Sequence, residues 1–288
     1  MIAVVGSVNQ DLVVRIAQHP QPGETVLGLG HDVGPGGKGA NQAVAAARLG
    51  ADVCFVGRIG ADEAGALLLA AFDEEGVDTA HVTVDPVLPS GLAVITVDQA
   101  GENSIVVDPG ANSGVTEDDV SAAGDVLAAA DVTLLQLEIP LAAVGRAAQL
   151  SRGTVILNPA PAQALSEELL ADVGLLVPNR HELERLTGSA DPASARDLPV
   201  PATIVTLGSE GAAVVTADGI DVLPAPMVNV VDTTGAGDAF VGALGEGLDR
   251  GLDLEDAVRR AVRAGALAVT APGARGGMAT AQRLTELR

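Results

Sequence analysis

Tryptophan and tyrosine are absent from the 288 residues, and Phe55, Phe72 and Phe240 are the only aromatic side chains. So few rings leave little on which successive bases could stack, which argues against a nucleic-acid binder. Basic residues are also scarce, since 16 Lys and Arg stand against 38 Asp and Glu and the formal net charge is −22. A field of that sign repels phosphate backbones and anionic lipid. We therefore expect no nucleic-acid partner and no membrane partner.

Cysteine and long hydrophobic runs are nearly missing as well. Cys54 is the only cysteine, so no internal disulfide can form, and its apolar neighbours predict a buried thiol. The four histidines are scattered without cysteine partners, which leaves no basis for a zinc site. The longest apolar stretch, 127–144, is interrupted by polar residues and a proline, and residues 1–5 lack the basic start of a signal peptide. We expect a cytoplasmic protein.

What is present is a regular alternation of short β-type runs and helical patterns. Apolar residues make up 48% of the chain, enough for a sizeable core. The alternation predicts an α/β fold with a central, mostly parallel sheet sandwiched by helices. The expected core strands are 2–5, 53–56, 132–137, 154–157, 175–177, 203–207 and 212–215. The expected helices are 40–49, 62–75, 141–150, one that begins at Gly235, and 254–269.

Two stretches break this alternation and predict a small separate β structure. Segments 12–15, 25–33, 92–97 and 104–107 have the pattern of paired strands joined by turns that contain Gly and Asn. We expect an antiparallel flap, built from about residues 10–33 and 90–108, on the α/β body. No long linker or internal repeat divides the chain, so residues 1–288 are expected to form a single domain with this lid.

A glycine-rich loop, residues 34–41, leads into the first long helix, and its glycines let a backbone approach a ligand closely. The GxGxxG spacing at Gly34, Gly36 and Gly39 makes a dinucleotide-binding turn, and with it an NAD(P) oxidoreductase, one interpretation. Lys38 lies inside this loop and is the only lysine of the chain. A three-donor ammonium kept at this one place indicates ligand binding, and a lysine in a solvated turn is the alternative.

The segment 231–240 places three small residues in succession at the start of a helix. Backbone N–H groups at Gly235, Ala236 and Gly237, with the positive end of the helix dipole, would form an anion hole suited to a phosphoryl group in transfer. Asp238 stands at its rim, either as an acid favoured in a helix's first turn or as a general base. Because a carboxylate repels a bound anion unless it takes part in chemistry, we favour a base that accepts a hydroxyl proton.

Acids and amides follow several expected strands, at the edge where open α/β sheets bind ligands. Asn179 and Glu182 are three residues apart, and on one face of a helical turn their oxygens would suit a hydrated Mg²⁺. Helix capping is the alternative for such residues. Other acids and amides in comparable positions are Asn9, Asp11, Asn41, Glu138 and Asn158. Asn9 and Asp11 would offer an amide and a carboxylate to a ligand rich in hydroxyl groups.

Taken in order, these motifs resemble the PfkB-type, ribokinase-like family of sugar kinases across essentially the whole chain. The matching segments are Asn9-Gln10-Asp11, Gly36-Gly37-Lys38-Gly39-Ala40-Asn41-Gln42-Ala43, Gly110-Ala111-Asn112, Gln136-Leu137-Glu138, Asn158-Pro159-Ala160-Pro161-Ala162, Asn179-Arg180-His181-Glu182, Thr206-Leu207-Gly208-Ser209-Glu210-Gly211 and 232–240. Eight matching segments in the same order favour this family strongly over the dinucleotide-binding interpretation. The resemblance implies a mostly parallel sheet with a β lid that also forms a homodimer contact.

The resemblance also implies roles for individual residues. The catalytic base would be Asp238, and the anion hole would be Gly235, Ala236 and Gly237. The sugar hydroxyls would be held by Asn9, Asp11, Gly37, Lys38, Asn41, Glu138 and Asp238. ATP would touch Asn179, Thr206, Gly208 and Gly211, and Mg²⁺ would be ordered by Glu182. A K⁺ site is implied at Asp232, Thr234, Ala268, Ala271 and Gly273.

Three features depart from the family pattern. Gly277 stands where members often carry a hydroxyl side chain near the K⁺ site, which implies a missing ligand or one replaced by water. Val262 stands where they often carry a polar residue near the adenine. The stretch 191–201 is short for the helix usually found there. Contacts at the edge of the nucleotide are therefore expected to differ from those of the family.

The expected function is ATP-dependent phosphorylation of the primary hydroxyl of D-ribose, which gives ribose 5-phosphate and ADP. A sibling kinase that acts on 2-deoxyribose, fructose or a nucleoside is the alternative within the class, and the scarcity of aromatic rings argues against the nucleoside. A sugar-binding regulatory protein that has lost turnover is the alternative outside it. The presence of Asp238 argues against that alternative, because a protein without turnover has no need of a base.

Overall fold

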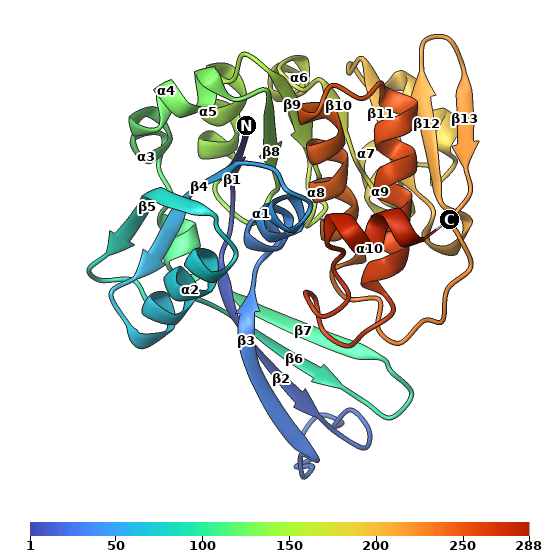
Figure 1. Cartoon of the computed structure of the whole chain (residues 1–288). Helices are drawn as coiled ribbons and strands as arrows, with labels where there is room; N and C mark the ends of the chain where they lie inside the picture. Colours follow the sequence, from blue (N-terminus) through green and yellow to red (C-terminus); the bar gives the residue numbers. More distant parts are fainter. Residues whose placement is uncertain (288) are drawn as a thin grey trace.

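The computed structural model describes residues 1–287, which form two separate β-sheets and the helices that cover the larger one (Figure 1). The strands of the larger sheet are β1 (Ile2–Val5), β4 (Val53–Gly60), β5 (Asp78–Asp85), β8 (Val132–Leu135), β9 (Thr154–Leu157), β10 (Leu175–Leu176), β11 (Ala202–Thr206), β12 (Ala212–Thr216) and β13 (Ile220–Leu223). Their order across the sheet is β13-β12-β11-β10-β9-β8-β1-β4-β5. All neighbours pair in parallel except β11 with β12 and β12 with β13. The predicted α/β fold with a mostly parallel sheet is confirmed.

The helices are α1 (Lys38–Arg48), α2 (Glu63–Glu74), α3 (Glu117–Ala122), α4 (Gly124–Ala129), α5 (Leu141–Leu150), α6 (Glu167–Ala171), α7 (Arg180–Thr187), α8 (Ala236–Asp249), α9 (Leu254–Ala268) and α10 (Ala281–Glu286). Every core strand and helix expected from the sequence is present, with some ends shifted. The two edge strands β5 and β13 were missed, because each is partly exposed and lacks the continuous apolar run of a central strand.

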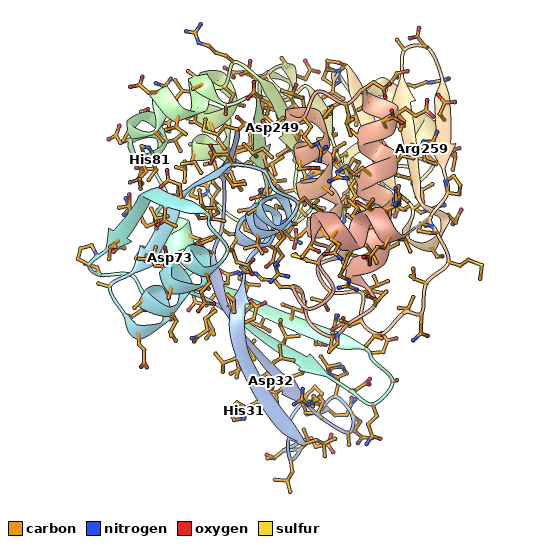
Figure 2. All side chains as sticks on the ribbon, viewed as in Figure 1. His31, Asp32, Asp73, His81, Asp249 and Arg259 are labelled. Carbon is orange, nitrogen blue, oxygen red and sulfur yellow. The ribbon has the colours of Figure 1, made fainter. Side chains whose placement is uncertain are left out.

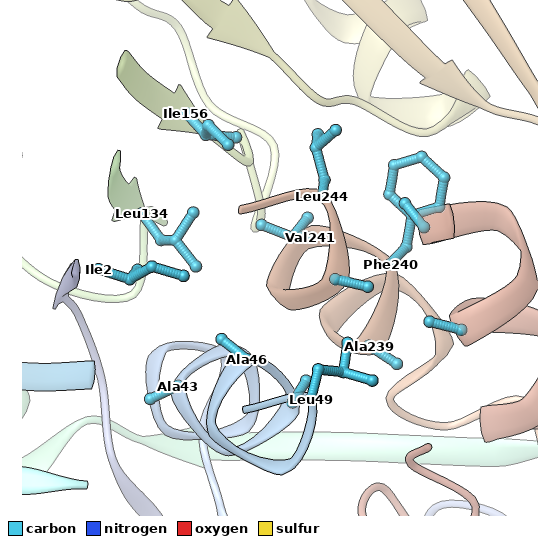
Figure 3. Packing of buried hydrophobic residues seen from close by; sticks show 14 of the residues in the cluster. Ile2, Ala43, Ala46, Leu49, Leu134, Ile156, Ala239, Phe240, Val241 and Leu244 are labelled. Carbon is cyan, nitrogen blue, oxygen red and sulfur yellow. The ribbon is translucent and has the colours of Figure 1, made fainter. Parts of the chain in front are cut away.

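The sheet buries both of its faces, because successive side chains of a strand point to opposite sides. On β1, Ile2 and Val4 belong to one hydrophobic cluster and Ala3 and Val5 to another. In the first cluster, side chains of β1, β8 and β9 face α1 and α8 (Figure 3). The facing surface of α1 is built from alanines, which lets this helix lie close to the sheet.

The four strands of the smaller sheet project from one end of the body (Figure 1). They are β2 (Asn9–Arg15), β3 (Gly30–Gly36), β6 (Gly91–Val97) and β7 (Asn103–Asp108), in the order β3-β2-β6-β7. The predicted flap is therefore present, formed by the two stretches that break the α/β alternation.

Two details of the predicted flap are wrong. It is not wholly antiparallel, because β2 and β6 pair in parallel from Asn9 opposite Gly91 onward. Both strands leave the body at the same level and each turns back in its own hairpin, so the two outgoing strands lie side by side and run the same way. The expected strand 25–33 is also misplaced, since β3 begins at Gly30 opposite Arg15, where β2 ends and offers no further partner.

Within residues 1–287, no helix has both the length and the apolar character needed to cross a bilayer. Cys54 is buried, as predicted. Figure 2 shows His31 on the projecting sheet and His81 on β5, in different parts of the molecule. In the described part of the chain, no three His, Cys, Asp or Glu side chains are grouped so that they could hold a metal ion.

Candidate active site

Two cavities lie next to each other beyond the ends of β9, β10 and β11, and they share Thr206 and Gly237. The first has a volume of about 200 Å³ and a largely polar lining. Its polar side chains are Lys38, Asn158, Asn179, Glu182, Thr206 and Asp238. The second is larger, about 570 Å³, and mostly apolar. The position agrees with the rule that open α/β sheets bind ligands outside the carboxyl ends of their strands.

The start of α8 forms one wall of the polar cavity. Gly235 caps the helix with φ of 76°, a conformation that favours glycine, and a Cβ there would lie 2.3 Å from the carbonyl oxygen of Ala274. The N–H of Ala236 is directed at the Thr233 carbonyl, 3.3 Å away. Among the described residues, the N–H groups of Gly237 and Asp238 have no partner, so they remain free for an anion at the helix N-terminus.

Asp238 is buried at the mouth of this helix and is 7% exposed. Its two carboxylate oxygens accept hydrogen bonds from side-chain amides of α1, Oδ2 from Asn41 Nδ2 at 3.2 Å and Oδ1 from Gln42 Nε2 at 3.1 Å. Burial raises the pKa of Asp238, and the Lys38 ammonium and the two amide donors oppose that shift. A desolvated carboxylate held from two sides beside free N–H groups is the arrangement expected of a general base.

Gln42 is a site residue to which sequence reasoning assigned no role, and its orientation is determined by its neighbours. The Val177 carbonyl accepts from Asn158 Nδ2 at 2.9 Å, which leaves Asn158 Oδ1 to accept from Gln42 Nε2 at 3.3 Å. Gln136 Nε2 donates to Gln42 Oε1 at 2.5 Å. Because a backbone carbonyl can only accept, this chain of contacts requires Gln42 to present its N–H to Asp238. Its burial and its place beside Asn41 on α1 were the available signals.

The sugar-side acids lie where β2, β3 and the segment after β8 meet. Asp11 lies across Gly36, where a Cβ would come within 2.1 Å of the carboxylate. Burial raises the pKa of Asp11 to about 7; Arg275 opposes that rise, and Glu138 and Asp238 add to it. Asp11 therefore changes charge near neutral pH, which is unusual for an aspartate.

Glu138 sits at the N-terminus of α1. Its Oε2 accepts from the Lys38 N–H at 3.0 Å and from Ser7 Oγ at 2.5 Å. Burial lowers the pKa of Lys38, but the carboxylates of Asp238, Glu138 and Glu182 outweigh that effect and the net shift is upward. The single lysine is thus a firmly charged group among acids rather than a solvated turn residue.

Asn9 is buried where the projecting sheet joins the body. Its Oδ1 accepts from Asn112 Nδ2 at 2.7 Å, and Asn112 also bonds both backbone polar groups of Val8. A Cβ on Gly91 would lie 2.2 Å from Asn9 Oδ1, so glycine is needed at that position. With its oxygen occupied, Asn9 keeps its amide N–H group available for a ligand.

Asn179 and Glu182 form a reciprocal capping box at the start of α7. The Glu182 N–H donates to Asn179 Oδ1, and the Asn179 N–H donates to Glu182 Oε2, each at 2.8 Å. The capping alternative is therefore present, yet both residues also line the polar cavity. Burial raises the pKa of Glu182, the largest effect on that group. A buried carboxylate facing a cavity with spare lone pairs fits a cation that keeps its water shell.

The loop that precedes α8 and the loop that follows α9 are tied together by Asp232. Its carboxylate accepts from the Thr234 N–H at 2.9 Å and from the Gly273 N–H at 2.8 Å. These contacts bring Asp232, Thr234 and Gly273 together, as the implied K⁺ site requires. At Gly277, a Cβ would lie 2.0 Å from the Ala268 carbonyl oxygen, so the departure from the family pattern has a steric reason here.

Three of the expected nucleotide residues line the apolar cavity, and the fourth, Asn179, lines the polar one. The wall of the apolar cavity includes Thr206, Gly208 and Gly211, together with Phe240 of α8 and Val262 of α9. Gly211 has φ of 102°, and a Cβ there would lie 2.0 Å from the Leu223 carbonyl oxygen. The stretch 191–201 contains only a short 3₁₀ helix, Pro192–Asp197.

Arg275 is a second residue to which the sequence assigned no role. Its Nε donates to Asn41 Oδ1 at 2.9 Å, and burial lowers its pKa to about 10. The only feature of the sequence that could have indicated Arg275 was its position within the loop of the implied K⁺ site.

The chain matches a model described as pfkB family carbohydrate kinase over residues 1–281. A ribokinase of Haemophilus influenzae is 40% identical over 297 aligned residues, which cover 99% of this chain and 97% of the relative. A deoxyribokinase of Salmonella typhimurium is 37% identical, with 94% of this chain and 93% of the relative covered.

Solved structures share the architecture. The ribokinase of Thermotoga maritima superposes with a TM-score of 0.93 at 35% identity, over 100% of this chain and 98% of that one. The ribokinase of Arabidopsis thaliana, solved in complex with ribose and ATP, superposes with a TM-score of 0.90 at 34% identity, over 99% and 97%.

Proposed function

The chain belongs to the pfkB family of carbohydrate kinases, and on this premise we propose that it phosphorylates D-ribose at the 5-hydroxyl with ATP, releasing ribose 5-phosphate and ADP. The observation that carries the proposal is the Asp238 carboxylate, held by two amide donors beside the free N–H groups of Gly237 and Asp238. The relative solved with ribose and ATP supports this choice of substrates.

In the proposed reaction, Asp238 takes the proton of the sugar hydroxyl while that oxygen forms its bond to the γ-phosphorus. The bond from the γ-phosphorus to the bridging oxygen of ADP breaks as the new bond forms. The anion hole predicted at Gly235, Ala236 and Gly237 would stabilise the negative charge on the phosphoryl oxygens in transfer, with the N–H group of Ala236 turning to them from the Thr233 carbonyl.

The sugar would lie between the base and the small sheet. Its hydroxyls would be held by Asn9, Asp11, Gly37, Lys38, Asn41 and Glu138. These residues supply ammonium, amide, carboxylate and backbone groups at the open side of Asp238, which is the dense polar set that a neutral sugar needs. The smaller sheet would act as a lid that excludes water from the site.

The nucleotide would place its base in the apolar cavity and its phosphates at the boundary with the polar one. Asn179, Thr206, Gly208 and Gly211 would contact it. Glu182 would hold Mg²⁺ through water, since its carboxylate faces the polar cavity and keeps lone pairs beyond those of the capping box. Mg²⁺, when bound, supplies charge neutralisation of the phosphates.

A K⁺ ion would lie beside the anion hole, at Asp232 and the carbonyls of Thr234, Ala268, Ala271 and Gly273. Oxygen donors on two loops already tied through Asp232 suit a weakly hydrated cation. The ion would stiffen the loops that carry Gly235.

A homodimer through the lid and a cytoplasmic location complete the proposal. The lid exposes Val33 and Val106, which are 56% and 71% exposed and lie on one face of the sheet, in the same row as Leu12 and Val94. Apolar side chains gathered on a projecting sheet favour a second copy as their cover. Sedimentation of the wild type and of Val106→Asp tests this contact, with a shift from dimer to monomer expected.

The substrate is tested by steady-state ADP release with ATP, Mg²⁺ and K⁺ against ribose, 2-deoxyribose, fructose and nucleosides. We expect the highest kcat/KM with ribose. A preference for 2-deoxyribose, which the deoxyribokinase relative makes the main alternative, would overturn the sugar assignment and leave the phosphoryl-transfer chemistry standing. Ribose binding without turnover would instead support a regulatory protein.

A further inference from the structure

Arg275 lies in the loop between α9 and α10, half-buried beside Asn41. Its Nε–H donates to Asn41 Oδ1 at 2.9 Å. The charges of Glu75, Arg48, Asp11 and Asp238 also influence the pKa of its guanidinium. With a pKa of about 10 it remains a cation at neutral pH.

This contact determines which way the Asn41 amide points. A guanidinium has donors and no acceptor, whereas the two ends of a carboxamide have the same shape and opposite hydrogen-bonding character. Because Arg275 occupies Asn41 Oδ1, the other end, Nδ2, is turned toward Asp238 Oδ2, 3.2 Å away. Without the guanidinium, only the single hydrogen bond to Asp238 would hold the amide, and its N–H would be free to tilt away from the carboxylate.

The neighbours of Arg275 touch the site at two further points. Gly273 donates its N–H to Asp232, and the carbonyl of Ala274 lies against Gly235, at the N-cap of α8. The carbonyl of Arg275 itself accepts from Arg48 Nη1, on α1, at 2.6 Å. Three consecutive residues of one loop therefore contact Asp232, the N-cap of α8 and helix α1, whose amides hold the Asp238 carboxylate.

Arg48 is itself anchored away from the cavity. Its guanidinium forms an ion pair with Glu75, the C-cap residue of α2, and both side chains are only partly exposed. The contacts thus run from α2 through α1 to the loop, and from the loop back to the start of α1 and to Asp238. Such a chain resists small displacements of the loop because each link is charged or charge-assisted.

We propose that Arg275 is a positioning residue, which holds the Asn41 amide in the orientation that donates to Asp238 and ties the loop 270–278 to α1. The inference rests on the proposed function only in taking Asp238 as the base. It holds for any sugar that the enzyme phosphorylates, and it adds a residue that acts through Asn41 rather than by touching the sugar.

The pH dependence of Asp238 reflects every charged group that faces it. These groups are Lys38 of α1, Asp11 of β2, Glu138 after β8, Glu182 of α7 and Arg275. Removing Arg275 takes away a positive charge and also frees the amide, and both changes raise the pKa of Asp238. A test must therefore separate the effect of charge from the effect of amide orientation.

A double-mutant cycle of Arg275→Met and Asn41→Ala separates the two effects. It compares kcat/KM at a pH above the acidic limb of the pH–rate profile, where Asp238 is ionised in every variant. We expect Arg275→Met to lower kcat/KM roughly 10-fold when Asn41 is present and less than about 2-fold when it is alanine. Equal losses in both backgrounds would overturn the proposal. Arg283→Met, an exposed arginine of α10, is the matched control and should leave kcat/KM unchanged.

Arg275→Lys keeps the charge and a donor, so it should retain most of the rate that Arg275→Met loses. A lysine variant as impaired as the methionine variant would contradict the positioning role. The same cycle can be read without turnover, by ¹³C NMR titration of the Asp238 carboxyl. The shift in the pKa of Asp238 caused by Arg275→Met should be larger when residue 41 is asparagine than when it is alanine. Equal shifts in the two backgrounds would overturn the proposal even if ribose proved not to be the substrate.

Discussion

The polar and apolar cavities share Thr206 and Gly237, yet different forces shape them. Around Asp238, each group is held by directional hydrogen bonds or by charge, and several links join residues more than a hundred positions apart in the chain. The neighbouring cavity is lined mainly by Val, Ala, Pro, Met and Phe side chains, whose contribution is shape and apolar area. The polar cavity is suited to chemistry and the apolar cavity to holding an apolar part of a ligand. Substitutions in the first should therefore lower kcat, and substitutions in the second should raise KM.

The largest expected effect is at Asp238. Asp238→Asn keeps the size of the side chain and removes the proton acceptor, so we expect kcat to fall by roughly 10³-fold or more. Sugar binding, measured by calorimetry, should persist because the donors around the site remain. Turnover near the wild-type rate would show that another group is the base, and a wild type without turnover would support the regulatory alternative.

A smaller loss is expected on the sugar side, at Asp11. Asp11→Ala removes a carboxylate that would accept from sugar hydroxyls, and it should raise the KM for ribose by roughly 10- to 100-fold with less effect on kcat. If Asp11 contacts the 2-hydroxyl, the preference for ribose over 2-deoxyribose should narrow in the variant. An unchanged preference would remove Asp11 from that contact.

Asp11 also predicts a pH dependence of sugar binding. Its pKa is raised to about 7, so the carboxyl is protonated below that pH and ionised above it. The ionised form accepts hydrogen bonds more strongly, so the KM for ribose should fall as the pH rises through 7. Asp11→Asn, which cannot titrate, should abolish that trend, and a trend that survives in the variant would assign it to another group.

An intermediate effect is expected where the two loops meet. Asp232→Ala removes the acceptor of the Thr234 and Gly273 N–H groups, and we expect kcat to fall about 10-fold. Activation by K⁺, measured against Na⁺ at constant ionic strength, should disappear in the variant. Activation that persists would place the cation elsewhere.

The smallest effect is expected in the apolar cavity. Val262→Ala removes apolar contact with the adenine ring that we place in this cavity. The contact is worth about 1 kcal/mol, so the KM for ATP should rise roughly 5-fold with kcat unchanged. Val258→Ala, on the same helix but buried away from the cavity, is the matched control that should lower stability and leave the KM for ATP unchanged. A fall in kcat at Val262 would weaken the contrast between the two cavities.

The fold and the main motifs were predictable because they are local. An apolar run long enough for a buried strand, or small residues before a helix, lies within about ten residues of sequence, and β1, β9 and α5 were placed to the residue. The edge strand β5 and the parallel pairing of β2 with β6 were not predictable, since each depends on which strand lies alongside.

The sequence by itself determined the α/β fold and the flap, and it singled out most residues that line the polar cavity, because periodicity and short motifs carry that information. Tertiary structure alone decided how Asp238 is held. Asn41 and Asp238 are 197 residues apart and Arg275 and Asn41 are 234 apart, so no local pattern could indicate their hydrogen bonds. The physical reason is that a carboxamide takes its direction from whichever donor or acceptor the folded chain places beside it.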